Sequence, residues 1–147
     1  CPKNVELDVA LEKLNSANIP VMFAVGNDRD YSKIDWPACH MSSNVFAIAG
    51  SENYNAPATY NNHDSTRTDF FDYGNQQVVR PGNIQAYAAG SSVANVSFAA
   101  KWLGIKTAKS YVSISDISNV IRNTSLSIKN SRGVSGLLID YGKATNG

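Results

Sequence analysis

Two polar residues stand where a chain of this pattern could perform nucleophilic chemistry. Asn27 follows the continuous apolar run of residues 21–25, which is typical of a buried parallel strand. Open α/β sheets bind ligands at the carboxyl ends of such strands, where an asparagine amide can donate to a developing oxyanion. Ser92 follows Gly90-Ser91 at the head of a segment of small and apolar residues. A helix beginning there would offer unpaired N–H groups and a positive partial charge beside the serine oxygen.

Each of these two features also has a simpler interpretation. Asparagine is common in turns because it tolerates left-handed backbone geometry, so Asn27 can be a turn residue. Serine is a preferred N-cap, so Ser91 or Ser92 can simply cap the helix. Taken singly, neither feature distinguishes catalysis from a structural role.

The elements that must position these residues are helices and apolar strands. Apolar spacing predicts a helix over residues 4–16, and apolar runs predict strands over 21–25 and 45–50. Residues 90–103 carry apolar side chains on all sides, so we expect a buried helix there. The order of helix, strand, loop and strand over residues 4–50 predicts an α/β fold with a parallel sheet flanked by helices.

The remaining segments complete this arrangement. A capped helix is predicted to start at Ser115-Asp116, and a short last strand is predicted over 137–139. The polar stretches 28–43 and 51–68 are rich in turn-forming residues, and we expect both to be surface loops. No repeat or linker divides residues 1–147, so they form one unit or one piece of a larger one.

Composition excludes several classes of function. Thirteen basic and twelve acidic side chains leave a net charge of +1, which gives no electrostatic case for binding nucleic acid. No apolar run approaches the roughly 20 residues that cross a bilayer, so we expect no membrane span.

In their order and spacing, the motifs resemble the C-terminal half of the catalytic domain of subtilisin-like serine proteases. The likeness covers nearly the whole chain, 1–147, and includes the helix over 4–16 and the strand that leads to Asn27. The other matching segments are Trp36-Pro37-Ala38, Asn44–Gly50, Asp69–Gly74, Arg80-Pro81-Gly82, Gly90–Ala94, Ser115–Ser125 and Gly136–Asp140.

The resemblance implies a mechanism and a missing partner. Ser92 would be the nucleophile of an acyl-enzyme mechanism, and the Asn27 side chain with the Ser92 N–H would form the oxyanion hole. The general-base histidine and its aspartate would lie upstream, in the N-terminal half of the same catalytic domain. The substrate would be a protein or peptide, no cofactor would be required, and the family suggests a secreted or otherwise extracytoplasmic protein.

Three departures from the family pattern keep a second hypothesis open. Val96 and Ser97 stand where the family has Pro-His, and Arg80 replaces the usual alanine before Pro-Gly. The segment from Gly82 to Gly90 is also short. The alternative is a catalytically inactive subtilase-like module used for binding or assembly.

Other reactive side chains have predominantly structural interpretations. The two histidines, His40 and His63, both follow Asn27, whereas the family's histidine precedes it, so neither is expected to be the base. Asp28, Asp30 and Asp35 suggest structural calcium, but their spacing matches no closed calcium loop, and a solvated loop is the favoured interpretation.

The two cysteines and the loop tyrosines are the last candidates for a functional role. Cys1 and Cys39 could pair, or Cys39 beside His40 could bind metal; we favour two unlinked thiols. Tyr60 and other aromatic residues in loops could line a substrate groove, although ordinary packing is the favoured role.

Overall fold

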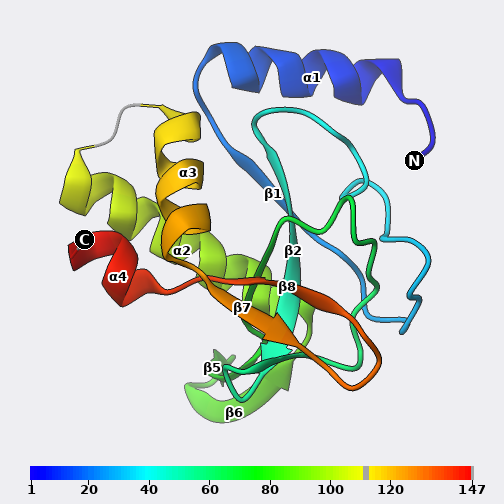
Figure 1. The fold of residues 1–147 in the computed structure, drawn as a ribbon, viewed down its shortest axis with the longest axis vertical. Helices are drawn as coiled ribbons and strands as arrows, with labels where there is room; N and C mark the ends of the chain where they lie inside the picture. Colours follow the sequence, from blue (N-terminus) through cyan, green and yellow to red (C-terminus); the bar gives the residue numbers. More distant parts are fainter. Residues whose placement is uncertain (111–112, 147) are drawn as a thin grey trace.

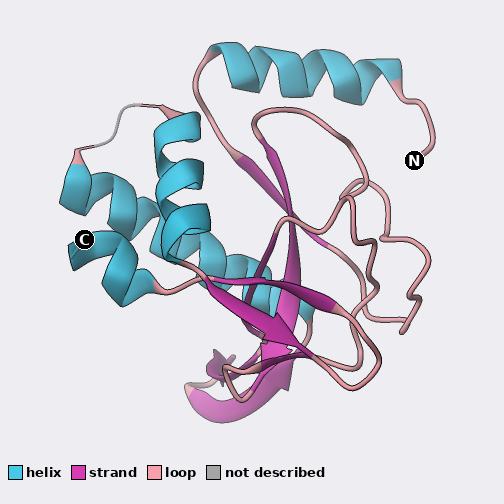
Figure 2. Ribbon diagram, in the orientation of Figure 1, coloured by secondary structure: helices cyan, strands magenta, loops and turns pink. Residues whose placement is uncertain are grey.

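The sheet at the centre of the structure is mainly parallel (Figures 1 and 2). Over residues 1–110 and 113–146, which the computed structural model describes, its strand order is β1-β2-β4-β8-β7, with β3 paired to β2. Strands β1, β2, β4 and β8 are parallel, and β7 returns antiparallel to β8. The α/β fold is thus confirmed.

The elements are α1 (Val5–Ser16), β1 (Val21–Ala24), β2 (Val45–Glu52), β3 (Ala56–Pro57), β4 (Phe70–Tyr73), β5 (Asn75–Arg80), β6 (Ile84–Ala89), α2 (Ser91–Lys109), α3 (Ile114–Thr124), β7 (Leu126–Lys129), β8 (Ser135–Leu138) and α4 (Tyr141–Asn146).

Strand β2 is buried on both of its faces. Helices α2, α3 and α4 gather on one side of the sheet in Figure 2, and there Phe46 and Ile48 pack against Phe98 and neighbouring residues. Ala47 and Ala49 point to the opposite face, where they join a second apolar cluster with Phe71. A strand covered on both faces needs apolar residues at every position, which explains its continuous apolar run.

The predicted bounds of α1, β1 and β2 are correct to within two residues, whereas α2 ends at Lys109 rather than at 103 and the cap of α3 is shifted. Helix α1 begins after Asn4, whose side chain accepts a hydrogen bond from the Leu7 N–H at 2.9 Å. Helix α3 begins at Ile114, and its N-cap is Ser113 rather than Ser115. The Ser113 hydroxyl accepts from the Asp116 N–H at 3.0 Å, so the capping chemistry is as predicted, two residues earlier.

The expectation that the helix after Gly90 is buried on all sides is wrong. Helix α2 extends to Lys109 and buries Phe98 and Trp102 against the sheet. Its other face leaves Val96 71% and Leu103 63% exposed. Apolar residues all round a helix require neighbours on every side, and the described residues cover only the sides that face the sheet and helices α3 and α4.

The expectation that residues 51–68 lie on the surface is also wrong in part. Asn61 and Asn62 are 1% exposed and His63 is 7% exposed. The amide of Asn61 bonds to both backbone groups of Gly50, with the Gly50 N–H at 2.8 Å and its carbonyl oxygen at 2.6 Å. Because polar side chains can be buried when their hydrogen bonds are satisfied, composition alone misplaced this segment.

A hairpin leads directly into α2. Strands β5 and β6 pair antiparallel from Asn75↔Ala89 to Arg80↔Ile84, and Pro81-Gly82-Asn83 forms the turn between them. Gly82 has a φ of 84° and Asn83 a φ of 60°, left-handed values that glycine and asparagine tolerate. The turn residues of this segment were therefore predictable, and the short return to Gly90 is one strand of the hairpin.

The two cysteines form a disulfide, so the preference for unlinked thiols is wrong. Cys1 and Cys39 are bonded with their Cα atoms 5.4 Å apart, although 38 positions separate them in sequence. Helix α1 returns the N-terminus to the loop that holds Cys39; the two segments meet on the right of Figure 1. Sequence distance contains no information about such an approach.

Reducing this disulfide is expected to destabilise the protein. Breaking a cross-link that spans 38 positions restores loop entropy to the unfolded chain and costs about 4 kcal/mol in the chain-entropy estimate. The measurement is the free energy of unfolding in urea of the full-length protein and of its Cys1→Ser/Cys39→Ser variant. An unchanged unfolding midpoint in the variant would contradict the prediction.

No helix within residues 1–110 and 113–146 is long and apolar enough to cross a membrane.

Candidate active site

The end of β1 and the start of α2 meet through hydrogen bonds of Ser91. The Ser91 hydroxyl accepts from the Gly26 N–H and donates to the Gly26 carbonyl, both at 3.2 Å. The Ser91 N–H donates to Asn27 Oδ1 at 2.8 Å. These bonds join positions 64 and 65 residues apart and bring the turn of Asn27 against the turn of Ser92.

The bond to Ser91 fixes the orientation of the Asn27 carboxamide. A backbone N–H can donate only to the oxygen of an amide side chain, so the Nδ2 group must occupy the other branch. Asn27 is exposed, and its Nδ2 group therefore lies where it can donate to a group outside the chain. Left-handed geometry does not account for Asn27 in this turn, because the residues there with positive φ are Gly26 (101°) and Arg29 (61°).

Ser92 is an exposed residue in the first turn of α2. The N-cap of the helix is Gly90, and it makes no side-chain capping bond, so neither serine has the simple capping role. Within the described ranges, no hydrogen bond engages the Ser92 N–H or its hydroxyl. The N–H belongs to the first four of the helix, which have no acceptor within the helix itself.

A buried segment of polar residues supports the loop after Asn27, and the sequence interpretation missed it. The Asn62 side-chain oxygen accepts from the N–H groups of Asp28 (2.9 Å) and Asp30 (3.1 Å). The Asn62 Nδ2 group donates to Asp35 at 2.9 Å and to Asp28 at 3.3 Å. A Cβ at Gly26 would overlap the side chains of Asp35 and Asn62, so a glycine is required there.

Neither histidine contacts Ser92 among the described residues. His40 Nδ1 lies 3.2 Å from Asp8 of α1, and His63 is buried with its ring against Phe71. Burial lowers the pKa of His63, an effect that the nearby Asp64 carboxylate only partly opposes. No bond joins either ring to Ser92 in the part of the chain that the structure describes.

The three aspartates suggested as calcium ligands have other partners. Asp28 and Asp35 bond to Asn62, whereas Asp30 accepts from the hydroxyl and the N–H of Ser32 at 2.7 and 2.9 Å. Among residues 1–110 and 113–146, no group of three or more His, Cys, Asp or Glu side chains is placed to hold a metal ion.

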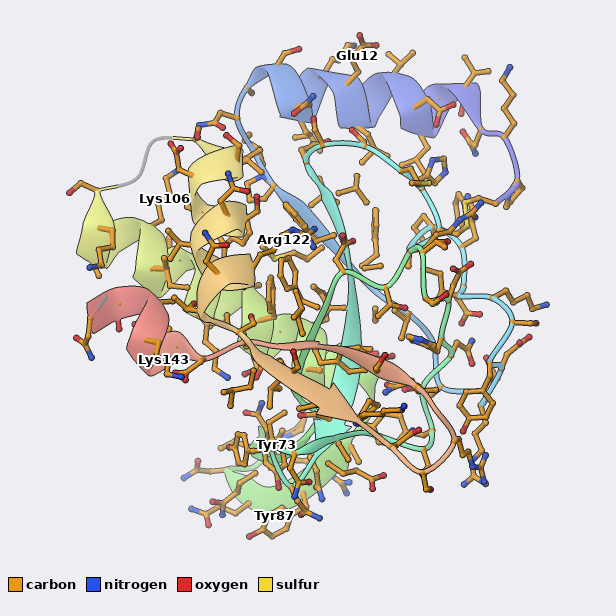
Figure 3. The ribbon with its side chains drawn as sticks, in the orientation of Figure 1. Glu12, Tyr73, Tyr87, Lys106, Arg122 and Lys143 are labelled. Carbon is orange, nitrogen blue, oxygen red and sulfur yellow. A yellow bond between two sulfur atoms is a disulfide. The ribbon has the colours of Figure 1, made fainter. Side chains whose placement is uncertain are left out.

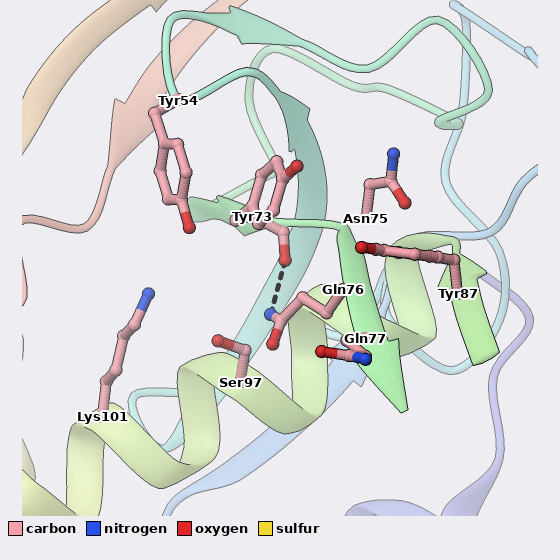
Figure 4. Close-up of a pocket in the computed structure, with 8 residues that line it drawn as sticks. All are labelled: Tyr54, Tyr73, Asn75, Gln76, Gln77, Tyr87, Ser97 and Lys101. Atoms are coloured by element: carbon pink, nitrogen blue, oxygen red, sulfur yellow. Dashed lines mark hydrogen bonds between the residues drawn. The ribbon is translucent and has the colours of Figure 1, made fainter. Parts of the chain in front are cut away.

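Two cavities border the helix that begins at Ser91. One of about 660 Å³ extends from Ser92 and is lined mainly by apolar groups, including Val78, Val93 and Val96. A second, of about 430 Å³, is lined by Tyr54, Tyr73, Tyr87, Asn75, Gln76, Gln77, Ser97 and Lys101 (Figure 4). Gln76 donates to the Tyr73 carbonyl in this wall at 2.8 Å. Both cavities share Gln76, Ser97 and Lys101, so they form neighbouring parts of one open face.

The charges near this face are largely paired. Lys101 bonds to Asp72, a fully buried carboxylate on β4 whose other oxygen has no partner among the described residues. Lys106 on α2 and Lys143 on α4, which pairs with Asp140 at 3.7 Å, lie away from Tyr73 and Tyr87 (Figure 3). The surface beside Ser92 is therefore apolar and aromatic rather than strongly charged.

Comparison with solved structures identifies the fold. Neither protein-family models nor curated proteins match the chain. The chain superposes on the prenylagaramide maturation protease PagA with a TM-score of 0.80 at 14% sequence identity. The match covers 98% of this chain and 56% of that one. A protease from Pseudoalteromonas arctica has a TM-score of 0.77 at 21% identity, over 98% and 47%. A cold-adapted subtilisin-like serine proteinase has a TM-score of 0.78 at 16% identity, over 94% and 50%.

These similarities define a class of fold. The chain has the fold of subtilisin-like proteases, as the sequence resemblance predicted. It spans about half the length of the solved structures that it matches.

Proposed function

We propose that the chain is the C-terminal half of a serine endopeptidase catalytic domain, with Ser92 as nucleophile and Asn27 in the oxyanion hole. The observation that carries the proposal is the 2.8 Å bond from the Ser91 N–H to Asn27 Oδ1. It aligns the amide of Asn27 beside the helix start that holds Ser92. The subtilisin-like fold supports the same assignment.

The proposed reaction proceeds through an acyl-enzyme. Ser92 Oγ attacks the peptide carbonyl carbon while the general base takes the hydroxyl proton. The carbonyl oxygen becomes an oxyanion that accepts hydrogen bonds from Asn27 Nδ2 and the Ser92 N–H. Collapse of this intermediate releases the amine, which takes the proton from the base, and water then hydrolyses the ester. These steps use side chains, backbone and water, so we propose no cofactor.

The general base and its aspartate are proposed to lie in the N-terminal half of the same domain. The open surfaces support this partner: β1 is an edge strand of apolar sequence, and Val96 and Leu103 on α2 are exposed. An apolar parallel edge is normally covered by another strand. A segment seated in the cavity beside Ser92 would also be close enough to deliver a base to its hydroxyl.

A secreted or otherwise extracytoplasmic location is part of the proposal. The Cys1–Cys39 disulfide supports it, because such bonds persist in oxidising compartments and are rare in reducing ones.

Labelling with a fluorophosphonate tests the proposed function. The full-length protein is treated with the probe, and the modified peptide is located by mass spectrometry. We expect modification of Ser92, because the probe reacts with serines that have an assembled base and oxyanion hole. Full-length, correctly folded protein that is not modified at Ser92 would favour the inactive binding or assembly module.

A further inference from the structure

The hydroxyl of Tyr60 contacts the backbone that leads into α2. It donates to the Gly74 carbonyl at 3.1 Å. The same carbonyl accepts the Gly90 N–H at 2.9 Å, and Gly90 is the N-cap two residues before Ser92. Tyr60 thus bonds to the same carbonyl that anchors Gly90, the residue directly before the Ser91-Ser92 start of α2.

The backbone of Tyr60 contacts the opposite side of the site. Its carbonyl accepts the Arg29 N–H at 3.1 Å, two residues after Asn27. The following residues, Asn61 and Asn62, are buried and fully engaged with Gly50 and with the loop after Asn27. Tyr60 therefore bonds directly to the loop after Asn27 and, through the shared Gly74 carbonyl, is linked to the Gly90 end of the Ser92 segment.

Close packing leaves the Tyr60 hydroxyl little freedom. A Cβ at Gly50 or at Gly74 would overlap this hydroxyl, so both positions require glycine. Burial raises the pKa of Tyr60 to about 12, and the backbone of Gly90 lowers it to a smaller extent. The hydroxyl consequently keeps its proton and remains a donor throughout the neutral and mildly alkaline range.

The geometry points to Tyr60 as a positioning residue that fixes the Ser92 turn relative to the loop of Asn27. This inference rests on the proposed function and deepens it, since Tyr60 acts through Gly74 and Gly90 and does not itself contact the substrate. The sequence suggested only packing or a groove wall for this tyrosine, because nothing in residues 51–68 indicates which backbone groups they reach.

The test compares Tyr60→Phe with Tyr31→Phe in the full-length protein. Tyr31 serves as the control because its hydroxyl also donates to a carbonyl of the same loop, that of Thr59, at 2.9 Å, but not to Gly74. It also accepts from Arg132 Nη1 at 2.9 Å, so this variant loses at least as many hydrogen bonds as Tyr60→Phe. One readout is the rate of fluorophosphonate labelling at Ser92. The other is hydrogen exchange of the peptide around Gly90–Ser92, which needs no catalytic activity.

For Tyr60→Phe we expect labelling to slow about threefold to tenfold and exchange around Gly90 to rise by a similar factor, the range set by one lost hydrogen bond. Tyr31→Phe should change neither, and the thermal midpoints of both variants should stay close to that of the parent. Unchanged exchange in Tyr60→Phe, or equal effects in both variants, would overturn the inference.

The two proposals fail in different ways. If the parent protein labels at Ser92 and Tyr60→Phe labels equally fast, only the role of Tyr60 is overturned. If the parent protein does not label, the proposed function fails first and the catalytic positioning role fails with it, whatever the exchange data show.

Discussion

Ser92→Ala is expected to reduce peptide hydrolysis by the full-length protein about a million-fold, to the level of catalysis that binding and the oxyanion hole supply alone. This is the scale found in subtilisin itself when its serine nucleophile is removed. Alanine lacks the oxygen that forms the acyl-enzyme, but it retains the helix propensity needed at the start of α2. The measurement is the turnover number with a peptide substrate, at enzyme concentrations high enough to detect the residual activity of the variant.

The matched control is Ser118→Ala, another helical serine of this chain. Ser118 lies on α3, and its hydroxyl donates only to the Ser115 carbonyl at 3.0 Å. We expect its turnover to equal that of the parent protein. Hydrolysis that persists in Ser92→Ala at the parental rate would show that another residue is the nucleophile.

The elements that place Asn27 and Ser92 were more predictable from the sequence than the contacts that support them. A strand such as β2 is visible as an apolar run because both faces are buried, and Gly90-Ser91 marks a helix start. These are local signals. The motifs on which the predicted resemblance depends are local as well, which explains why the fold was predictable although identity to the solved structures is only 14 to 21%.

What the sequence did not reveal depends on contacts between distant segments. The Cys1–Cys39 disulfide requires α1 to return the terminus to a loop, and no local pattern encodes that approach. The burial of Asn61 and Asn62 depends on backbone groups of Gly50, Asp28 and Asp30, which composition cannot show. Their polar side chains are satisfied by partners on other elements, so a rule that places asparagine on the surface fails there.

The exposed face of α2 has a different cause. Its sequence is apolar on all sides, as a helix buried all round would require, yet Val96 and Leu103 are open to solvent. Sequence and structure agree if a further segment covers that face in the complete protein. The mismatch between composition and burial therefore supports the same N-terminal half that the proposed chemistry of Ser92 would require.

Replacing Asn27 by aspartate separates two functions of its amide. Aspartate keeps an oxygen to accept the Ser91 N–H, so the contact at 2.8 Å can persist. It replaces the Nδ2 donor by a second oxygen, which places negative charge where the oxyanion would form. We expect the turnover number to fall at least 100- to 1000-fold, the effect of deleting the corresponding asparagine of subtilisin, with KM little changed.

A charge control and a neutral variant complete this test. Asn123→Asp makes the same change at an exposed position of α3 and should leave turnover at the parental value. Asn27→Leu removes both the Nδ2 donor and the Oδ1 acceptor. Its turnover number should therefore fall because the oxyanion donor is lost, and the hydrogen bond from the Ser91 N–H should be lost as well. Because an oxyanion donor acts on the transition state, the loss must appear in kcat; a change confined to KM would mean that Asn27 binds substrate without stabilising the oxyanion.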